Sequence, residues 1–369
     1  MFNRHMLRYS RELAGLSKTE LAERIGCTVS AVSQFESGAI EAPDDGRIDA
    51  IARELGIHRG LLMRPVSPIT PLDIDACHFR AMVSTSTRER RQAVHQGALI
   101  IAVLRELEEL GVEFPRERVS DFTMQRADLD TLASALRRHW GLGLGPIPNL
   151  IALLESKGVV VLPLGELSDK VDAFSTWAGE RPCMFLGLNK AASRTRFDAA
   201  HELAHLLFHH DVVPGDRALE EEADRFAGAF LLPRETFAAE CPRQWNLDRF
   251  VELKRRWRVS IAAMVMRGRH LGLLTDYAIK QAFKELSYRQ MRKDEPAEPN
   301  RESPVLLEKA LELVSSATSL ESLSYSLGMD TRTVTAQLSK CVSSTVLAQL
   351  REPDEERGNI VHVAFNRRS

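Results

Sequence analysis

The sequence has few cysteines, almost no net charge and no long apolar run, and each absence excludes a class of protein. Its five cysteines are scattered and never form a CxxC pair, which argues against a disulfide framework and favours reduced thiols. No run of about 18 apolar residues occurs and the first residues contain no apolar signal core, so we expect a cytoplasmic protein without a membrane span. The net charge of −2 excludes a uniformly basic surface, so any contact with nucleic acid must come from a local patch.

The most informative stretch present is residues 201–205, which read HELAH. Residues four apart lie on one face of a helix, about one turn apart, and no glycine or proline interrupts the surrounding pattern. His201 and His205 can therefore reach one metal ion at about 2.0–2.1 Å. Glu202 can hold a metal-bound water as a general base. The stretch predicts a zinc site with its own base.

A second helical pattern downstream is placed to complete this site. Its apolar residues recur at helical spacing and Pro233 ends it. Glu220 and Asp224 are four apart and share a face, so one carboxylate can be the third zinc ligand while the other accepts the spare N–H of a ligand histidine. The alternative is a solvated helix start whose glutamates favour the helix dipole.

Together these stretches resemble the ImmA/IrrE family of zinc metallopeptidases. The resemblance is carried by RFDAAHELAHL at 196–206, by ExxxDRFA at 220–227 and by LLP at 231–233. In that family HExxH and a glutamate thirteen residues before the proline of an LLMP-like motif bind the metal, and counting back from Pro233 gives Glu220. Here leucine stands where methionine usually precedes the proline, an apolar change. Glu221 and Glu222 compete for the ligand role, but helix phase with Asp224 favours Glu220.

Residues 1–63 form a string of short helical patterns. Ser17 and Glu20 make a capping box, a tight connection at Gly26 follows, and Thr28 caps the next helix. This connection is typical of a helix-turn-helix. Residues 16–38 resemble the Cro/repressor (Xre) DNA-binding domain over its whole length.

The Xre resemblance implies that the helix after Thr28 enters the major groove of double-stranded DNA. Gln34 can pair with adenine and Val29 can touch a thymine methyl group. We expect six residues to contact DNA, three at base edges and three at phosphates: Val29, Ser30 and Gln34, then Thr28, Ser33 and Lys18. Family members often have glutamine at position 18. The domain holds eight basic and nine acidic residues, a weak electrostatic footprint, so the alternative is a helical domain used only for dimerisation or partner binding.

At 369 residues the chain should hold two or three domains. We predict a mainly α fold with a small β-sheet (α+β), the sheet comprising a buried strand at 159–162 and a hairpin of 172–177 with 183–186. One sheet edge can then pair with an extended substrate. The predicted segments are a five-helix DNA-binding domain (1–63), a linker and amphipathic helix (64–128), a zincin-like peptidase domain (129–283), a mobile linker (284–303) and a mainly helical C-terminal domain (304–369).

Four smaller features have less specific interpretations. Arginines 88, 90 and 91 start the amphipathic helix and either contact phosphate or form a solvated face. Helix-turn-helix spacing at 320–338 is better explained as a packed helix pair, and 360–365 is a candidate strand. His209 and His210 can be extra ligands or acid catalysts, but we expect them at the surface. His78 has no second pair of ligands to make a metal site.

These patterns predict a DNA-binding transcriptional regulator that carries a zinc-dependent endopeptidase. Its resemblance to ImmA/IrrE implies that the substrate is a repressor protein or another copy of this chain, cleaved in a stress or mobile-element response. We expect a homodimer on palindromic DNA, with no membrane partner. The alternative is a ligand- or metal-sensing transcription factor whose zincin domain is not proteolytic.

Overall fold

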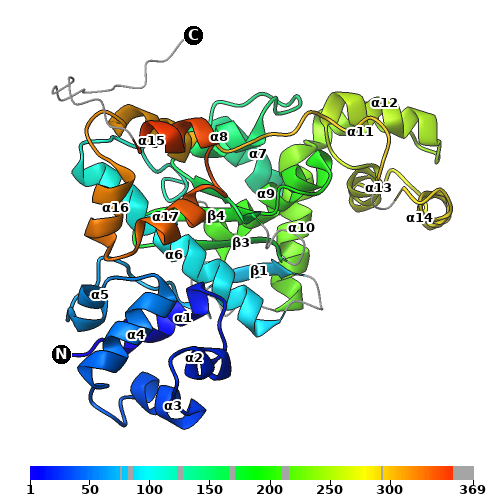
Figure 1. Ribbon diagram of the computed structural model, residues 1–369. Helices are drawn as coiled ribbons and strands as arrows, with labels where there is room; N and C mark the ends of the chain where they lie inside the picture. The colour runs from blue at the N-terminus through cyan, green and yellow to red at the C-terminus, as the bar shows by residue number, and fades with distance from the viewer. Residues whose placement is uncertain are drawn as a thin grey trace. The chain divides into compact units, whose positions relative to one another are not determined.

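The structure is a computed structural model that describes residues 1–74, 77–81, 86–122, 128–165, 171–209, 216–291 and 294–351. The chain divides into two compact units, each assembled from separate stretches of sequence (Figure 1). The first unit comprises residues 1–74, 83–114 and 305–369, and the second comprises 75–82 and 115–304. The predicted α+β class is confirmed, because helices dominate the described residues and these include one small sheet, in the second unit.

The first unit begins with the five predicted short helices. Ser17 and Glu20 form the reciprocal capping box, Gly26 takes a positive φ of 65° in the turn, and the Thr28 side chain caps the next helix. These local devices fix the connection between the second and third helices. The five helices are α1 (Arg4–Leu13), α2 (Lys18–Arg24), α3 (Val29–Ser37), α4 (Asp45–Leu55) and α5 (Arg59–Met63).

Helix α6 (Thr87–Glu109), the predicted amphipathic helix, is the centre of the first unit. Its middle is buried on every side, as expected for a helix packed against several others. It contacts α1 and three C-terminal helices, and Figure 1 shows α16 and α17 in orange beside it. The C-terminal helices are α15 (Leu306–Val314), α16 (Leu320–Leu327), α17 (Thr331–Leu338) and α18 (Ser344–Gln349).

Two helix turns far apart in sequence pair with each other in this unit. Ile57, between α4 and α5, forms an isolated antiparallel bridge with Met329, between α16 and α17. The His58 amide donates to Gly328 O at 2.9 Å and the Asp330 amide donates to Gly56 O at 3.0 Å. Helices α16 and α17 contact each other, and the turn between them is attached to the end of α4.

The second unit contains a four-stranded sheet in the order β1-β3-β4-β2. The predicted hairpin is formed by β3 (Val171–Ala178) and β4 (Arg181–Leu186), which pair antiparallel. The predicted buried strand is β2 (Val160–Pro163), parallel to β4. Strand β1 (His78–Ala81) pairs antiparallel with β3 and was not predicted, because it lies in the stretch expected to be a linker.

Helix α9 (Ala192–Phe208) carries the HELAH stretch and packs on β3, β4 and α10 (Arg217–Leu231). The core beneath it includes Leu203, Phe226 and Phe230, all fully buried. The remaining helices are α7 (Leu129–His139), α8 (Leu150–Ser156), α11 (Arg234–Glu240), α12 (Leu247–Trp257), α13 (Ile261–His270) and α14 (Asp276–Tyr288). Within the described part of the chain, no helix is both long and apolar enough to span a membrane.

The prediction of a mobile linker at 284–303 is wrong for the residues of this range that the structure describes. Its first residues belong to α14, and the rest is held by carboxylates that reach into the second unit. Glu295 binds the buried Lys254 at 2.8 Å, and Glu302 accepts the Leu150 amide at 2.8 Å and pairs with the buried Arg196. The polar composition that suggested a solvated linker reflects these ion pairs, because buried cations need carboxylate partners.

Candidate metal centre and DNA-binding surface

His201, His205 and Glu220 converge on one point between α9 and α10. Both histidines are buried, and their Nε2 atoms lie 3.0 Å apart. Glu220 Oε2 lies 3.2 Å from His201 Nε2, and Glu220 Oε1 lies 3.5 Å from His205 Nε2. Two consecutive helices therefore present three potential ligand atoms to the same small volume.

This donor set fits a zinc ion. Tetrahedral ligands at about 2.0–2.2 Å from zinc lie about 3.3 Å from one another, and the three observed separations lie on either side of that value. Two imidazoles and one carboxylate are also a common catalytic zinc set, which leaves a fourth position open. The competing glutamates have other contacts: Glu221 pairs with Arg217 at 2.9 Å and Glu222 lies 3.6 Å from His209 Nε2.

Asp224 contacts the other nitrogen of His201. Its Oδ1 lies 2.9 Å from His201 Nδ1. If Nδ1–H donates to this carboxylate, the Nε2 lone pair of His201 is left facing the convergence point. The contact is the one expected of a residue that orients a metal ligand from outside the coordination shell.

His209 corrects one expectation, because it is not at the surface. It is 2% exposed, and its Nδ1 lies 2.9 Å from His205 Nδ1. Burial lowers its pKa, an effect that Glu222 only partly opposes, so its ring favours the neutral form. A neutral His209 can accept from His205 and direct its own Nε2–H toward Glu222. The spacing of four from His205 was the available signal; His210 lies outside the described residues.

Glu202 is fully buried and is held by the sheet. Ser175 Oγ, from the middle of β3, donates to Glu202 Oε2 at 2.6 Å. This hydrogen bond fixes the orientation of the carboxyl group. Ser175 was missed in the sequence because its only signal is its place in a strand, and the pairing of β3 with α9 is not visible there.

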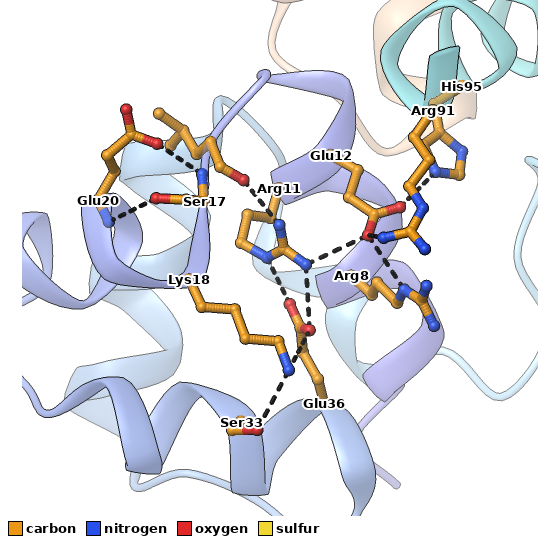
Figure 2. A network of polar contacts seen from close by, with 11 residues as sticks. Arg8, Arg11, Glu12, Ser17, Lys18, Glu20, Ser33, Glu36, Arg91 and His95 are labelled. Carbon is orange, nitrogen blue, oxygen red and sulfur yellow. Dashed lines mark hydrogen bonds and ion pairs between the residues drawn. The ribbon is translucent and has the colours of Figure 1, made fainter. Parts of the chain in front are cut away.

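The predicted DNA-contacting residues lie on α2 and α3 of the first unit. Thr28, Val29, Ser30 and Gln34 are exposed, as a contact surface requires, although the Thr28 hydroxyl also caps α3. Figure 2 shows a different environment for the other two. Lys18 Nζ donates to Ser33 Oγ at 3.1 Å and lies 3.6 Å from Glu36, so these two predicted phosphate contacts hold each other.

The α3 helix is fastened to α1 by a buried ion pair. Arg11 Nη2 donates to Glu36 Oε2 at 3.1 Å, and Arg11 Nη1 donates to Leu16 O at 2.7 Å (Figure 2). Both charged side chains are largely buried, so removing one partner would leave the other uncompensated. This arrangement keeps the exposed face of α3 in a fixed orientation within the helix-turn-helix.

The fold and the site define a helix-turn-helix protein with a metallopeptidase-like domain. Residues 7–62 match the family model described as helix-turn-helix, and residues 154–268 match the peptidase M78 model described as IrrE N-terminal-like domain. The two matches occur in the predicted order and confirm the predicted resemblance. Neither a curated protein nor a solved structure matches the chain.

Proposed function

We propose that this chain is a transcriptional regulator whose second unit is a zinc-dependent endopeptidase, with a repressor protein or another copy of the chain as substrate. The observation that carries the proposal is the convergence of His201, His205 and Glu220 beside a held Glu202. The domain matches supply the DNA-binding half. A role in a stress or mobile-element response rests on the resemblance to ImmA/IrrE.

Each residue of the centre has a distinct task in peptide hydrolysis. Zinc, when bound, supplies a Lewis acid that polarises the scissile carbonyl and lowers the pKa of water. Glu202 removes the proton from the attacking water and delivers it to the leaving amine. Ser175 keeps the Glu202 carboxyl group oriented during these transfers. Asp224 and His209 hold the imidazole rings of His201 and His205 at the angles that ligation needs.

The DNA half of the proposal rests on the exposed start of α3. Val29, Ser30 and Gln34 would read base edges, and Lys18, Thr28 and Ser33 would contact DNA phosphates. One such domain reads only a few base pairs, so two copies on a palindrome are expected.

The decisive experiment compares the zinc-loaded wild type with its Glu202→Gln variant. Each protein is incubated with candidate repressors and with a tagged second copy of the chain, and new N-termini are identified by mass spectrometry. Cleavage by the wild type alone supports the endopeptidase. If neither protein cleaves and both regulate a reporter promoter identically under every inducing condition, the zincin domain is a sensor that sets DNA affinity.

A further inference from the structure

The second unit contains a cavity of about 770 Å³ that excludes the three candidate zinc ligands. Its walls come mainly from α9, α10, α13 and α14, and Asp172 of β3, Lys190 and Glu295 complete the lining. Asp224 lines it, so the cavity begins on the far side of the carboxylate that touches His201. The volume falls in the range of about 300–1,000 Å³ found for small-molecule sites.

The acidic side chains that line this cavity form ion pairs or hydrogen bonds with other side chains of the second unit. Five carboxylates line it, and each is bound by another side chain of the unit. The pairs are Asp172 and Asp198 with Lys190, Glu221 with Arg217, Asp224 with His201, and Glu295 with Lys254. These pairs balance the negative charge only in part, because Asp172 and Asp198 share Lys190 and His201 is neutral when it ligates a metal.

Three arginines of the lining have no such partner. Arg194, Arg225 and Arg269 lie on α9, α10 and α13, and within the described ranges none of them forms an ion pair. Arg267, by contrast, is buried and bound to Asp130. All three are exposed, and they are the arginines of the lining whose guanidinium groups remain available to an anionic ligand.

His270 responds to the same charges. It lines the cavity, and burial together with Arg225, Arg267 and Arg269 lowers its pKa. Burial is the largest cause of this lower pKa, the arginines lower the pKa further, and Asp130 opposes them.

The remaining wall is apolar. It is formed by Phe197 of α9, Met266 of α13, and Phe283 and Leu286 of α14, with two alanines at the start of α13. Small-molecule sites commonly combine an apolar lining with a few charged groups that fix the orientation of the ligand. Arginine is well suited to carboxylate and phosphate groups because its planar fork binds both in a bidentate manner.

We propose that this cavity, here called the arginine pocket, binds a small organic anion that combines an apolar body with a carboxylate or phosphate group. The anionic group pairs with Arg194, Arg225 and Arg269, and the apolar body packs on Phe197, Met266 and Phe283. Binding requires neither zinc nor peptide hydrolysis. An experiment that contradicts the arginine pocket therefore leaves the proposed peptidase untouched, and the reverse is also true.

Isothermal titration of the full chain with four probes tests the ligand class. The probes are octanoate, octyl phosphate, inorganic phosphate and 1-octanol. Octanoate or octyl phosphate should bind about tenfold more tightly than either inorganic phosphate or 1-octanol. Only the first two molecules combine an anionic group for the arginines with an apolar chain for the apolar wall. The stronger of the two identifies the preferred head group. Equal or absent binding of all four probes overturns the proposal.

Variants then locate the site. Arg225→Gln with Arg269→Gln should weaken the better probe by about tenfold or more, since charge-assisted hydrogen bonds are lost. The matched control is Arg138→Gln, an exposed arginine of α7 outside the pocket, and it should leave affinity unchanged. Ala263→Trp fills the cavity and should abolish binding if it folds; the arginine variants decide the question if it does not. Unchanged affinity in the double variant, or an equal loss in Arg138→Gln, overturns the assignment.

Discussion

Ser175 Oγ lies 2.6 Å from Oε2 of Glu202, which joins the middle of β3 to the candidate general base on α9. The two residues are 27 positions apart in sequence and both are buried. A general base must keep its geometry while its proton comes and goes. The sheet therefore does more than pack against α9, because it also positions the candidate general base.

Replacing Ser175 by alanine should separate positioning from metal binding. Loss of an outer contact of this kind typically costs about 10–100-fold in activity. We expect kcat of Ser175→Ala to fall by about tenfold with little change in KM, while zinc content and thermal stability stay close to wild type. Ser175→Thr keeps the hydroxyl and should recover most of kcat. Full activity in the alanine variant would remove Ser175 from the catalytic arrangement.

Zinc content should depend on three residues and not on their neighbours. His201→Ala, His205→Ala and Glu220→Ala each remove one of three protein ligands and should purify without stoichiometric zinc. Glu202→Gln should stay metallated. Elemental analysis of the purified proteins measures this, with Glu221→Ala as the matched control for Glu220. A zinc-replete Glu220→Ala protein would place the third ligand elsewhere.

The contact between His205 and His209 predicts a weaker effect. His209→Ala removes the partner of His205 Nδ1, so zinc affinity should fall by about 10–100-fold without loss of the site. Competition with a chelator of known affinity gives the number. Glu222→Gln should show a smaller loss in the same direction, because Glu222 reaches His205 only through His209. Identical chelator curves for His209→Ala and the wild type would make this histidine a packing residue.

Two variants of the helix-turn-helix should distinguish residues that read bases from residues that contact phosphates. Gln34 is exposed on α3, and Gln34→Ala should cost about 1–3 kcal/mol on the cognate site and relax preference at one base pair. Lys18→Ala should weaken all sequences alike and flatten the salt dependence. Both are read from binding isotherms at several salt concentrations. Unchanged cognate affinity in Gln34→Ala would show that α3 is not the reading helix.

The Glu12–His95 contact predicts a pH-dependent contribution to the stability of the first unit. Burial raises the pKa of Glu12, but hydrogen bonds and charge from His95 and Arg8 outweigh it and lower the pKa to about 2. The carboxylate therefore stabilises the fold above its unfolded pKa of about 4.3, and this contribution is lost as the pH falls toward 2.

Comparison of Glu12→Gln with the wild type measures that contribution. The variant should be less stable by about 2 kcal/mol near neutral pH, because Arg91 and His95 lose a charged acceptor. The difference should shrink as the pH is lowered from about 5 toward 2 in denaturant titrations. A difference that is constant over this interval would mean that Glu12 acts through packing and not through its charge.

The parts of this molecule that were predictable from sequence are those with local causes. The capping box of Ser17 and Glu20 marks where α2 begins, and the spacing of His201 and His205 places both on one helix face. Glu220 was assigned by its distance from Pro233, and the structure does bring it to the two histidines. In each case the deciding residues lie within a few turns of one helix or follow a motif of fixed length.

The features that could not be predicted depend on contacts between segments that are far apart in the chain. Such contacts cannot be recognised from the local pattern of a single sequence. Strand β1 lies beside β3, about a hundred positions away, and is only four residues long. Ser175 acquires its partner through that same sheet. The helices after residue 305 join the first unit because their apolar faces fit α6, and no local pattern names α6 as the partner.

The chain crosses between its two units four times, at about residues 74, 82, 114 and 304. Consequently, hydrolysis within residues 64–74, which follow α5 and contain Pro65, Pro68 and Pro71, would break the covalent link of the helix-turn-helix without removing its contacts to the rest of the first unit. Helix α1 remains bound to α6 through Tyr9 and Glu12, and the turn at Gly56 remains bound to Asp330 and Thr333. After such a cleavage the DNA-binding domain would stay in place until these contacts separate. The effect of proteolysis on regulation would therefore be delayed by the time that the domain takes to dissociate.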